Sequence, residues 1–184
     1  MQNREKLARV KLLVLDVDGV LTEGDVTYGT EGLELKTFNV KDGLGIRLAM
    51  NFGLAVAIAT GRKSDAVARR ARELGVTQVL QNASDKESAL RRLCESLAVP
   101  LEHTAFLADD LNDLPGLKMV GAPMAVADAA PEVRAAAVYV TRARGGRGAA
   151  REAIEAILSS QGKWQEAVAS YLNSLKKKSA GTTR

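Results

Sequence analysis

Cysteine, histidine and aromatic residues are scarce in this chain of 184 residues. It has one cysteine, Cys94, one histidine, His103, and an aromatic share of 4%. A single cysteine cannot build the disulfide framework of a small secreted protein, so we expect a reducing, cytoplasmic location. Cys94 lies among leucines at helical spacing and is expected to fill the core, and His103 is expected to lie in an ordinary loop.

Long apolar runs and several enzyme motifs are also missing. No apolar run approaches the roughly 18 residues of a membrane-spanning helix, and "MQNREKLAR" has no apolar segment of signal-peptide length. No G-x-S-x-G of a serine hydrolase occurs, and Gly43 and Gly45 lack the preceding buried strand of a dinucleotide site. We therefore expect one globular domain that does not bind membranes.

A basic surface is lacking too, although the formal net charge is +4. The surplus comes from the tail, which has no acidic residue and holds Lys176, Lys177, Lys178 and Arg184. Without these four, 22 basic residues balance 22 acidic ones. The pattern predicts one domain over residues 1–175 and a disordered basic tail over 176–184, and it argues against nucleic-acid binding.

The apolar pattern that is present alternates between strands and helices. Strands are expected at 10–17, 54–60, 77–81, 104–109, 123–128 and 138–141, helices between and after them, and a hairpin within 24–39 around "GTEG". Ser64 is expected to cap one helix, and Ser84 with Glu87 to form a capping box for the next. This alternation predicts an α/β fold, a doubly wound, Rossmann-like parallel sheet with helices on both faces and a small hairpin.

Polar residues gather where the expected strands end. They are Asp16 and Asp18 after the first strand, Thr60 after the second, Lys86 after the third, and Asp109, Asp110 and Asp113 after the fourth. Ligands of such sheets bind beyond the carboxyl ends of the strands. Several carboxylates at one edge repel one another unless a cation lies between them, and an all-oxygen set suits magnesium.

These residue types fit phosphoryl transfer. Asp16 can attack phosphorus to give an aspartyl phosphate, and Asp18 can protonate the departing alkoxide and then activate water. Strand alternation would point both side chains to one face, where they share one small volume. Thr60 and Lys86 supply a hydroxyl and a positive charge for phosphate oxygens.

Simpler explanations exist for each residue taken alone. Asp16 and Asp18 could form a strand-end turn, because Asp favours turns, and Lys86 could be a solvated lysine of a first helical turn. The basic segment "RARGGRG" and its flank hold Arg142, Arg144, Arg147 and Arg151. It is either a solvated loop or an arm that grips a carboxylated or phosphorylated ligand.

Four segments resemble, in order and spacing, the motifs of the haloacid dehalogenase superfamily of phosphatases. They are "DVDGVLT" (16–22), "TGR" (60–62), "DKESAL" (85–90) and "ADDLNDLP" (108–115). The resemblance implies that Asp16 is the nucleophile and a magnesium ligand, that Asp18 is the acid/base and binds the metal through its carbonyl, and that Asp109 is the third ligand. It places Thr60, Gly61 and Lys86 at the phosphate, with Asp110 and Asp113 supporting the ligands. Ala108 and Asn82 stand where the family usually has Gly.

Further segments are similar to the cap-less branch of this superfamily, which contains phosphatases of 3-deoxy-D-manno-octulosonate 8-phosphate. They are "FNVKDGLGIR", "VGAPMAVADAAPEV" and "YVTRARGGRGAAREAIEAIL". The resemblance implies that the substrate is this small sugar acid phosphate. It also implies that the substrate is contacted by Lys41, Asp42, Gly43, Arg62 and Arg147. Two alternatives remain open, a nine-carbon keto-deoxy sugar acid 9-phosphate as substrate, or a signalling receiver domain, which would instead place a lone Asp after its third strand.

The spacing of the motifs leaves no room for a lid. Only 42 positions separate Asp18 from Thr60, and the hairpin and one helix use them. Phosphoryl transfer to a small molecule gains from excluded water, so we expect another chain to close the site. A lone hairpin exposes strand edges, which favours assembly. We expect a homotetramer by resemblance, with hairpins packed together, shared active sites, and Arg147 reaching a neighbour's substrate.

Overall fold

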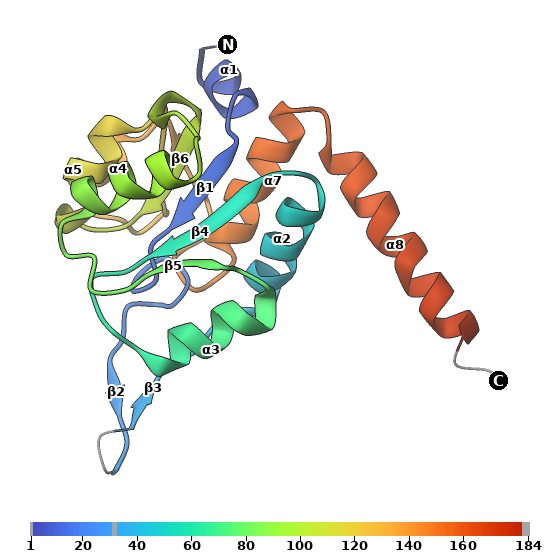
Figure 1. Ribbon diagram of the computed structural model, residues 1–184, viewed down its shortest axis with the longest axis horizontal. Coiled ribbons are helices and arrows are strands. Elements are labelled where there is room, and N and C mark those ends of the chain that lie inside the picture. The colour runs from blue at the N-terminus through green and yellow to red at the C-terminus, as the bar shows by residue number, and fades with distance from the viewer. Residues whose placement is uncertain (1, 31–32, 182–184) are drawn as a thin grey trace.

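A six-stranded sheet lies at the centre of the computed structural model, which describes residues 2–30 and 33–181, with only the backbone for residue 2 and residues 178–181 (Figure 1). The strand order is β5-β4-β1-β6-β7-β8, and every neighbouring pair is parallel. The strands are β1 (Leu12–Leu15), β4 (Ala55–Ala59), β5 (Gln78–Leu80), β6 (Thr104–Ala108), β7 (Ala122–Ala125) and β8 (Tyr139–Val140). Central β1 is apolar and buried throughout, as expected of a strand covered on both faces.

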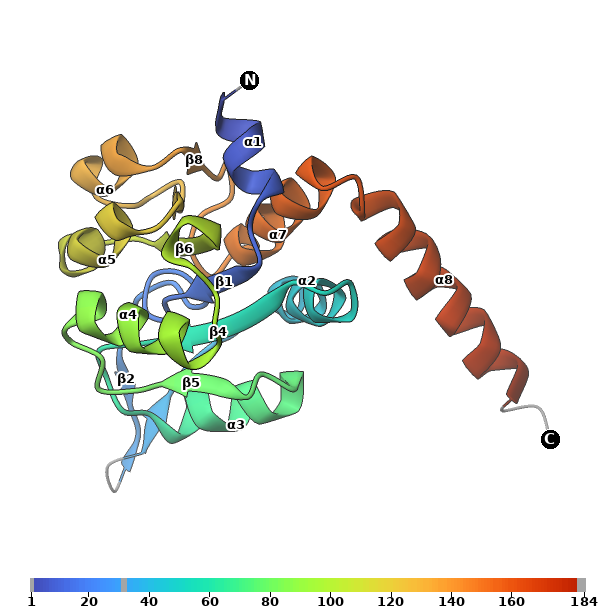
Figure 2. The same cartoon turned by 45° about the horizontal axis from the view of Figure 1, so that its top comes forward.

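Helices cover both faces of this sheet (Figure 2). One layer contains α2 (Val40–Asn51), α3 (Asp65–Leu74) and α7 (Ala149–Ser160), and the other contains α4 (Lys86–Ser96), α5 (Leu114–Met119) and α6 (Pro131–Ala136). Short 3₁₀ turns lie at η2 (Leu101–His103) and η3 (Leu111–Asp113). The doubly wound α/β fold predicted from the alternation of strands and helices is confirmed, as is the burial of Cys94.

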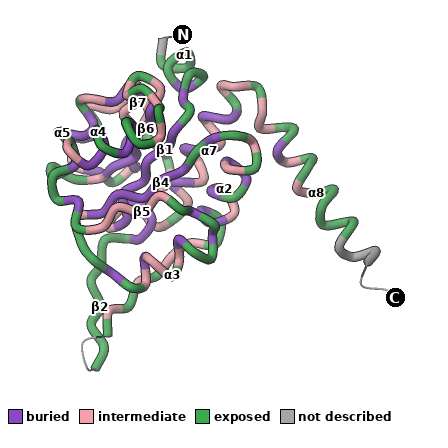
Figure 3. The backbone as a smooth tube through the Cα atoms, in the orientation of Figure 1, coloured by how far each residue is buried: buried purple, intermediate pink, exposed green. Residues whose placement is uncertain are grey.

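A small hairpin projects from the body of the protein. Its strands β2 (Thr27–Tyr28) and β3 (Glu34–Leu35) pair antiparallel, as expected, and residues 31 and 32 of the expected turn lie outside the described residues. Figure 3 shows the hairpin as largely exposed, in contrast to the buried sheet. The hairpin connects the loop after β1 to helix α2, so it lies beside the carboxyl edge of the sheet.

Two helix starts differ from expectation. Asp85 is the N-cap of α4, and its Oδ1 accepts a hydrogen bond from Ser88 N at 3.0 Å. The predicted capping box of Ser84 and Glu87 is therefore wrong by one position, because a carboxylate is at least as good a cap as a hydroxyl. Ser64 does stand at the start of α3, but its side chain makes no capping hydrogen bond. Helix α1 (Gln2–Ala8) was not anticipated, because seven residues show little periodicity.

The C-terminal segment also differs from expectation. The chain turns at Gly162, whose φ is 72°, and enters a separate helix α8 (Trp164–Gly181) that extends away from the body (Figure 1). The expected domain boundary at residue 176 falls inside this helix. Residues 176–181 of the expected disordered tail are helical, and residues 182–184 lie outside the described residues. Leu, Ala and Lys are good helix formers, which explains why the helix continues. Among the described residues, no helix has the length and apolar character to span a membrane.

Candidate functional site

The loops that follow three neighbouring strands meet at one edge of the sheet. Strand β1 lies between β4 and β6, and the three strands lead directly into Asp16, Thr60 and Asp109. The backbone is tied across this edge, because Asp16 N donates to Leu107 O at 3.1 Å and Thr60 N donates to Leu80 O at 2.9 Å. Parallel strand order therefore brings together residues that lie far apart in the sequence.

Three carboxylates form a cluster at this edge. One carboxylate oxygen from each of Asp16, Asp109 and Asp113 lies within 4.8 Å of the others, and Asp16 and Asp113 are buried. Gly19 allows Asp109 to come this close, since a Cβ at position 19 would overlap the Asp109 carboxylate, and its φ of 83° also favours glycine. Asp113 is expected to support the ligands, and its Oδ2 accepts a hydrogen bond from Asp109 N at 3.4 Å within this cluster.

Lys86 lies against this cluster and is fully buried. Its Nζ donates to Asp16 Oδ1 at 2.5 Å and to Ala59 O at 2.7 Å, and it lies 3.1 Å from Asp113 Oδ1. Lys86 is the first residue of α4, so the helix begins at the edge and sends the side chain inward. A buried ammonium requires such partners, which excludes the solvated lysine considered above.

The cluster holds more negative charge than Lys86 can balance. The pKa of Asp16 is raised to about 7, mainly by burial, with the charge of Lys86 opposing the rise and that of Asp113 adding to it. Burial and then the charges of Asp16 and Asp113 raise the pKa of Asp109 to about 8. Burial alone would lower the pKa of Lys86, but Asp16 and Asp113 outweigh it and raise that pKa. An all-oxygen set with excess negative charge fits a hard divalent cation such as magnesium.

Asp18 lies beside this cluster but outside it. Its Oδ1 accepts a hydrogen bond from Lys36 Nζ, which comes from the base of the hairpin. Strand alternation does not set the relative directions of the Asp16 and Asp18 side chains, because β1 ends at Leu15 and the chain turns from Val17 onward. No sequence pattern singles out Lys36, because the lysines of a polar hairpin ordinarily lie in solvent.

The segment after β4 lines the same edge. Thr60 is buried, and its Oγ1 accepts a hydrogen bond from Arg62 N at 3.3 Å. Gly61 is open, because a Cβ there would meet nothing closer than Ser84 Cα at 3.9 Å. Arg62 turns toward the hairpin, where its Nη2 lies 3.2 Å from Glu34 Oε1. Thr60 and Gly61 thus leave space beside the carboxylates.

Two of the residues expected to contact substrate, Asp42 and Gly43, also have partners within the chain. Asp42 is buried and accepts a hydrogen bond from Arg151 N at 2.8 Å, in the first turn of α7, where backbone N–H groups lack helical partners. Gly43 packs against Arg70 and Leu74 of α3 so closely that a Cβ would overlap the Arg70 guanidinium. These positions hold α2 against α7 and α3, and their contacts with substrate stay a prediction. Lys41 is exposed near the start of α2.

Asp110 is also more peripheral than expected. It is exposed, and its Oδ1 accepts a hydrogen bond from Leu111 N at 2.8 Å at the start of η3. It contributes negative charge to the surroundings of Asp109, but it is not among the three carboxylates that gather. Its role in this structure is to cap a short turn.

The glycine-rich arginine arm packs on the loop that follows Asp18. Gly146 N donates to Val20 O at 2.9 Å, and a Cβ on Gly145 would overlap Gly19 O. Each of its arginines has an acidic partner within the chain: Arg142 with Glu152, Arg144 with Asp128, Arg147 with Glu23 and Arg151 with Glu155. The Arg147 side chain is nevertheless 65% exposed. The backbone of the arm is therefore fixed against the site loop, while the side chains of Arg142, Arg144 and Arg147 remain largely exposed.

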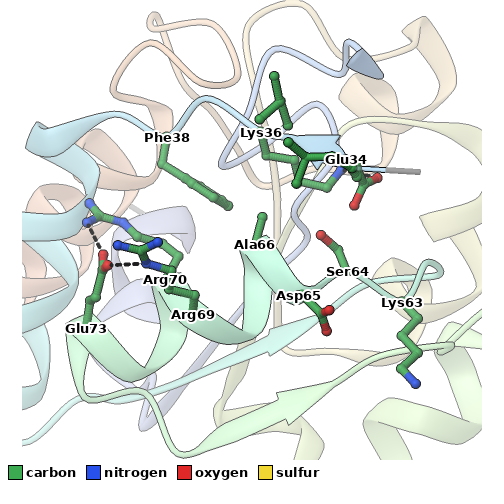
Figure 4. Close-up of a pocket in the computed structure, with 12 residues that line it drawn as sticks. Glu34, Lys36, Phe38, Lys63, Ser64, Asp65, Ala66, Arg69, Arg70 and Glu73 are labelled. Atoms are coloured by element: carbon green, nitrogen blue, oxygen red, sulfur yellow. Dashed lines mark hydrogen bonds and ion pairs between the residues drawn. The ribbon is translucent and has the colours of Figure 1, made fainter. Parts of the chain in front are cut away.

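A cavity of about 730 Å³ adjoins the site between the hairpin and α3 (Figure 4). Glu34, Lys36 and Phe38 line it from the hairpin side, and Ser64 and Arg70 line it from α3. The three clustered carboxylates do not line it. The cavity therefore lies next to the site, and Lys36 connects the two, because it lines the cavity and contacts Asp18.

Comparisons with known proteins agree with this geometry. Residues 73–152 match the family of haloacid dehalogenase-like hydrolases. The chain is 48% identical to the 3-deoxy-D-manno-octulosonate 8-phosphate phosphatase KdsC of Escherichia coli strain K12 over 162 residues, which cover 88% of this chain and 86% of that protein. The KdsC of Yersinia pestis is 44% identical and covers 89% of this chain.

Solved structures of phosphatases for the same substrate are also similar to this chain. The crystal structure of the phosphatase from Yersinia pestis has a TM-score of 0.87 and 43% identity and covers 89% of each chain. That from Moraxella catarrhalis, in complex with a magnesium ion, a phosphate ion and KDO, has a TM-score of 0.90 and 39% identity and covers 92% of this chain and 98% of that one. Because it is 48% identical to a KdsC protein over 88% of its length, this chain belongs to the KdsC family of 3-deoxy-D-manno-octulosonate 8-phosphate phosphatases, within the haloacid dehalogenase-like hydrolases.

Proposed function

We propose that this protein hydrolyses 3-deoxy-D-manno-octulosonate 8-phosphate to the free sugar acid and phosphate, a step of lipopolysaccharide sugar biosynthesis. The observation that carries the proposal is the largely buried cluster of Asp16, Asp109, Asp113 and Lys86 at the carboxyl edge of the sheet. A related protein that matches over 92% of this chain binds magnesium, phosphate and KDO. The receiver alternative is not retained, since β5 is followed by Gln81 rather than by a phosphoacceptor Asp.

The proposed chemistry divides one hard hydrolysis into two steps. Asp16 attacks phosphorus and forms an aspartyl phosphate while the ester bond to the sugar oxygen breaks, and Asp18 gives that oxygen a proton. Asp18 then takes a proton from the water that attacks the phosphoenzyme, which releases phosphate and restores Asp16. Thr60 and Gly61 would hold phosphate oxygens, and Lys86, 2.5 Å from Asp16, stabilises negative charge next to the reacting oxygen.

A magnesium ion would be held by Asp16 and Asp109, with Asp113 beside them and the Asp18 carbonyl as a further ligand. Bound there, it neutralises charge on the phosphate and on the carboxylates. Without it, the raised pKa values of Asp16 and Asp109 keep these groups partly protonated near neutral pH, so a nucleophilic Asp16 depends on positive charge nearby.

A phosphate-release panel tests the substrate. We expect the eight-carbon sugar acid 8-phosphate to exceed hexose phosphates in kcat/KM by at least about 10²-fold, because a site built to bind a carboxylate leaves its own cations unpaired with other substrates. A nine-carbon keto-deoxy sugar acid 9-phosphate is the second arm, and a higher kcat/KM for it would reassign the substrate. Equal activity on all compounds would contradict the proposal.

We also propose that the active protein is a homotetramer. The hairpin exposes Val26, Tyr28, Leu33 and Leu35, by 40% to 70% of their surface. Exposed apolar side chains on a two-stranded sheet favour association with other copies, and the adjoining cavity leaves room for a neighbouring chain. The cytoplasmic location stays a prediction.

Shared active sites are part of this assembly proposal. The ion pair of Arg147 with Glu23 is largely exposed, so it is weak and can be exchanged for a substrate group. Asp16→Asn and Arg147→Ala proteins, each inactive or weak alone, should recover activity when unfolded and refolded together. If each site combines Asp16 of one chain with Arg147 of another, up to about a quarter of the sites become intact in random mixtures.

A matched mixture serves as the control for that experiment. Asp16→Asn and Asp18→Asn change residues of one loop, so no mixture of these two variants contains an intact site. The expected result is recovery in the first mixture and none in the second. Absence of recovery in verified mixed oligomers would confine Arg147 to its own chain, and a monomer at assay concentration would remove the shared-site proposal.

A further inference from the structure

The base of the hairpin is joined to the catalytic loops by a row of alternating charges. Lys36, just after β3, contacts Asp18 Oδ1 with its Nζ and lies 3.5 Å from Glu34 Oε1. The same Glu34 oxygen lies 3.2 Å from Arg62 Nη2 in the segment after β4. The row therefore runs from Asp18 through Lys36 and Glu34 to Arg62, and it connects two loops of the site through the hairpin.

Lys36 is unusual because it is enclosed. Its side chain is 1% exposed, whereas Leu33 and Leu35 of the same hairpin are 56% and 50% exposed. An ammonium is withdrawn from water only at considerable cost unless carboxylates surround it, and here both partners are carboxylates. A lysine that served only the solubility of the hairpin would point outward. The enclosed position instead fixes the direction in which the Asp18 carboxylate points.

We propose that Lys36 is a positioning residue that orients the Asp18 carboxyl group for proton transfer in both steps of the reaction. The inference rests on the proposed role of Asp18. Without the contact, Asp18 is free to rotate away, and proton transfer requires hydrogen-bond reach between the acid and the leaving oxygen. Because Lys36 belongs to the hairpin, the inference also links proton transfer to the element that we expect to form the subunit interface.

The leaving group separates this role from a purely structural one. In the first step, the bond from Asp16 to phosphorus forms, the bond from phosphorus to the leaving oxygen breaks, and the proton of Asp18 goes to that oxygen. A sugar alkoxide is a strong base and needs this proton, whereas p-nitrophenolate is stable in water without it. A badly oriented Asp18 should therefore slow phosphoenzyme formation from alkyl phosphates far more than from p-nitrophenyl phosphate.

The experiment measures kcat/KM, which reports the steps up to phosphoenzyme formation, for Lys36→Met, Lys36→Arg and the control Lys118→Met, which changes an exposed residue of α5. The substrates are the sugar acid 8-phosphate, glycerol 1-phosphate, which has no carboxylate, and p-nitrophenyl phosphate. For Lys36→Met we expect losses of about 10- to 100-fold on both alkyl phosphates and less than about 3-fold on the aryl phosphate. Lys36→Arg, which keeps the charge, should restore much of the loss, and Lys118→Met should match the wild type.

Each other result overturns the inference. A loss confined to the sugar acid phosphate would show that Lys36 contacts the substrate's carboxylate rather than orienting Asp18. Equal losses on all three substrates would make Lys36 a structural anchor, and unchanged values would make its contact incidental. Retained aryl phosphatase activity shows that the variant is folded. Failure of the proposed function would be visible separately, as a wild-type protein that does not prefer the sugar acid phosphate.

Discussion

Replacement of Asp16 by asparagine should abolish turnover, with kcat lowered by more than about 10⁴-fold, because an amide cannot attack phosphorus and loss of a nucleophile usually exceeds the cost of losing one proton-transfer group. Asp18→Asn should act differently. It leaves the nucleophile in place and removes the group that acts as acid and base. We expect kcat to fall by about 10²- to 10⁴-fold, the typical contribution of such a group. Single-turnover kinetics on the sugar acid phosphate would compare the two variants.

The Asp16→Asn protein should remain folded. Asp16 is one of three clustered carboxylates that share a single ammonium, so removal of its charge relieves repulsion with Asp109 and Asp113. In chelator, we expect a melting temperature no lower than that of the wild type. Asp110→Asn is the matched control, because Asp110 is exposed and asparagine caps a turn equally well. Near-normal turnover of Asp16→Asn would contradict covalent catalysis at this residue.

Removal of divalent cation should abolish turnover and destabilise the protein in a manner that depends on pH. Burial raises the folded-state pKa of Asp16 from 3.8 to about 7 and that of Asp109 to about 8. Between pH of about 4 and 8, the folded metal-free protein therefore binds more protons than the unfolded chain, so its free energy of unfolding decreases as pH rises. Magnesium competes with these protons, and its stabilising effect should grow with pH.

Thermal melts of metal-free protein, with and without added magnesium chloride, at pH of about 5.5 and 8 test whether stabilisation by magnesium grows with pH. The difference in melting temperature between the two melts isolates the site from all other titrating groups. We expect a larger difference at the higher pH and little difference at either pH for Asp109→Asn. An equal or larger effect of magnesium at pH of about 5.5 would show that these carboxylates do not bind it.

Residues at strand ends could be located from sequence because strand order alone decides which loops meet. Apolar runs marked β1, β4 and β6, and parallel pairing then required Asp16, Thr60 and Asp109 to lie at one edge. The orientation of side chains beyond the strands could not be predicted in this way. Asp18 was expected beside Asp16, but β1 ends one residue before Asp16, so strand alternation no longer applies there.

Contacts between distant segments set the other differences. Asp42 is expected to contact the substrate, and the structure adds a contact that the sequence did not indicate, because α2 lies against α7 and Arg151 N donates to Asp42 Oδ1. Lys36 had no signal in the sequence, because a lysine near a hairpin strand is ordinarily solvated and only the fold of the hairpin base onto the loop after β1 encloses it. These outcomes depend on tertiary packing, which local patterns do not encode.

Direct detection of a phosphoryl group on Asp16 tests the central claim. The protein, loaded with magnesium, would be mixed with the sugar acid 8-phosphate, quenched within one turnover and treated with borohydride, which reduces an aspartyl phosphate to homoserine. Peptide mass spectrometry then identifies the modified position. We predict homoserine at position 16 in the wild type and in Asp18→Asn, in which the second step is also slowed, and none without substrate. Release of phosphate within the same turnover without modification of Asp16, or with modification of another residue, would contradict the account.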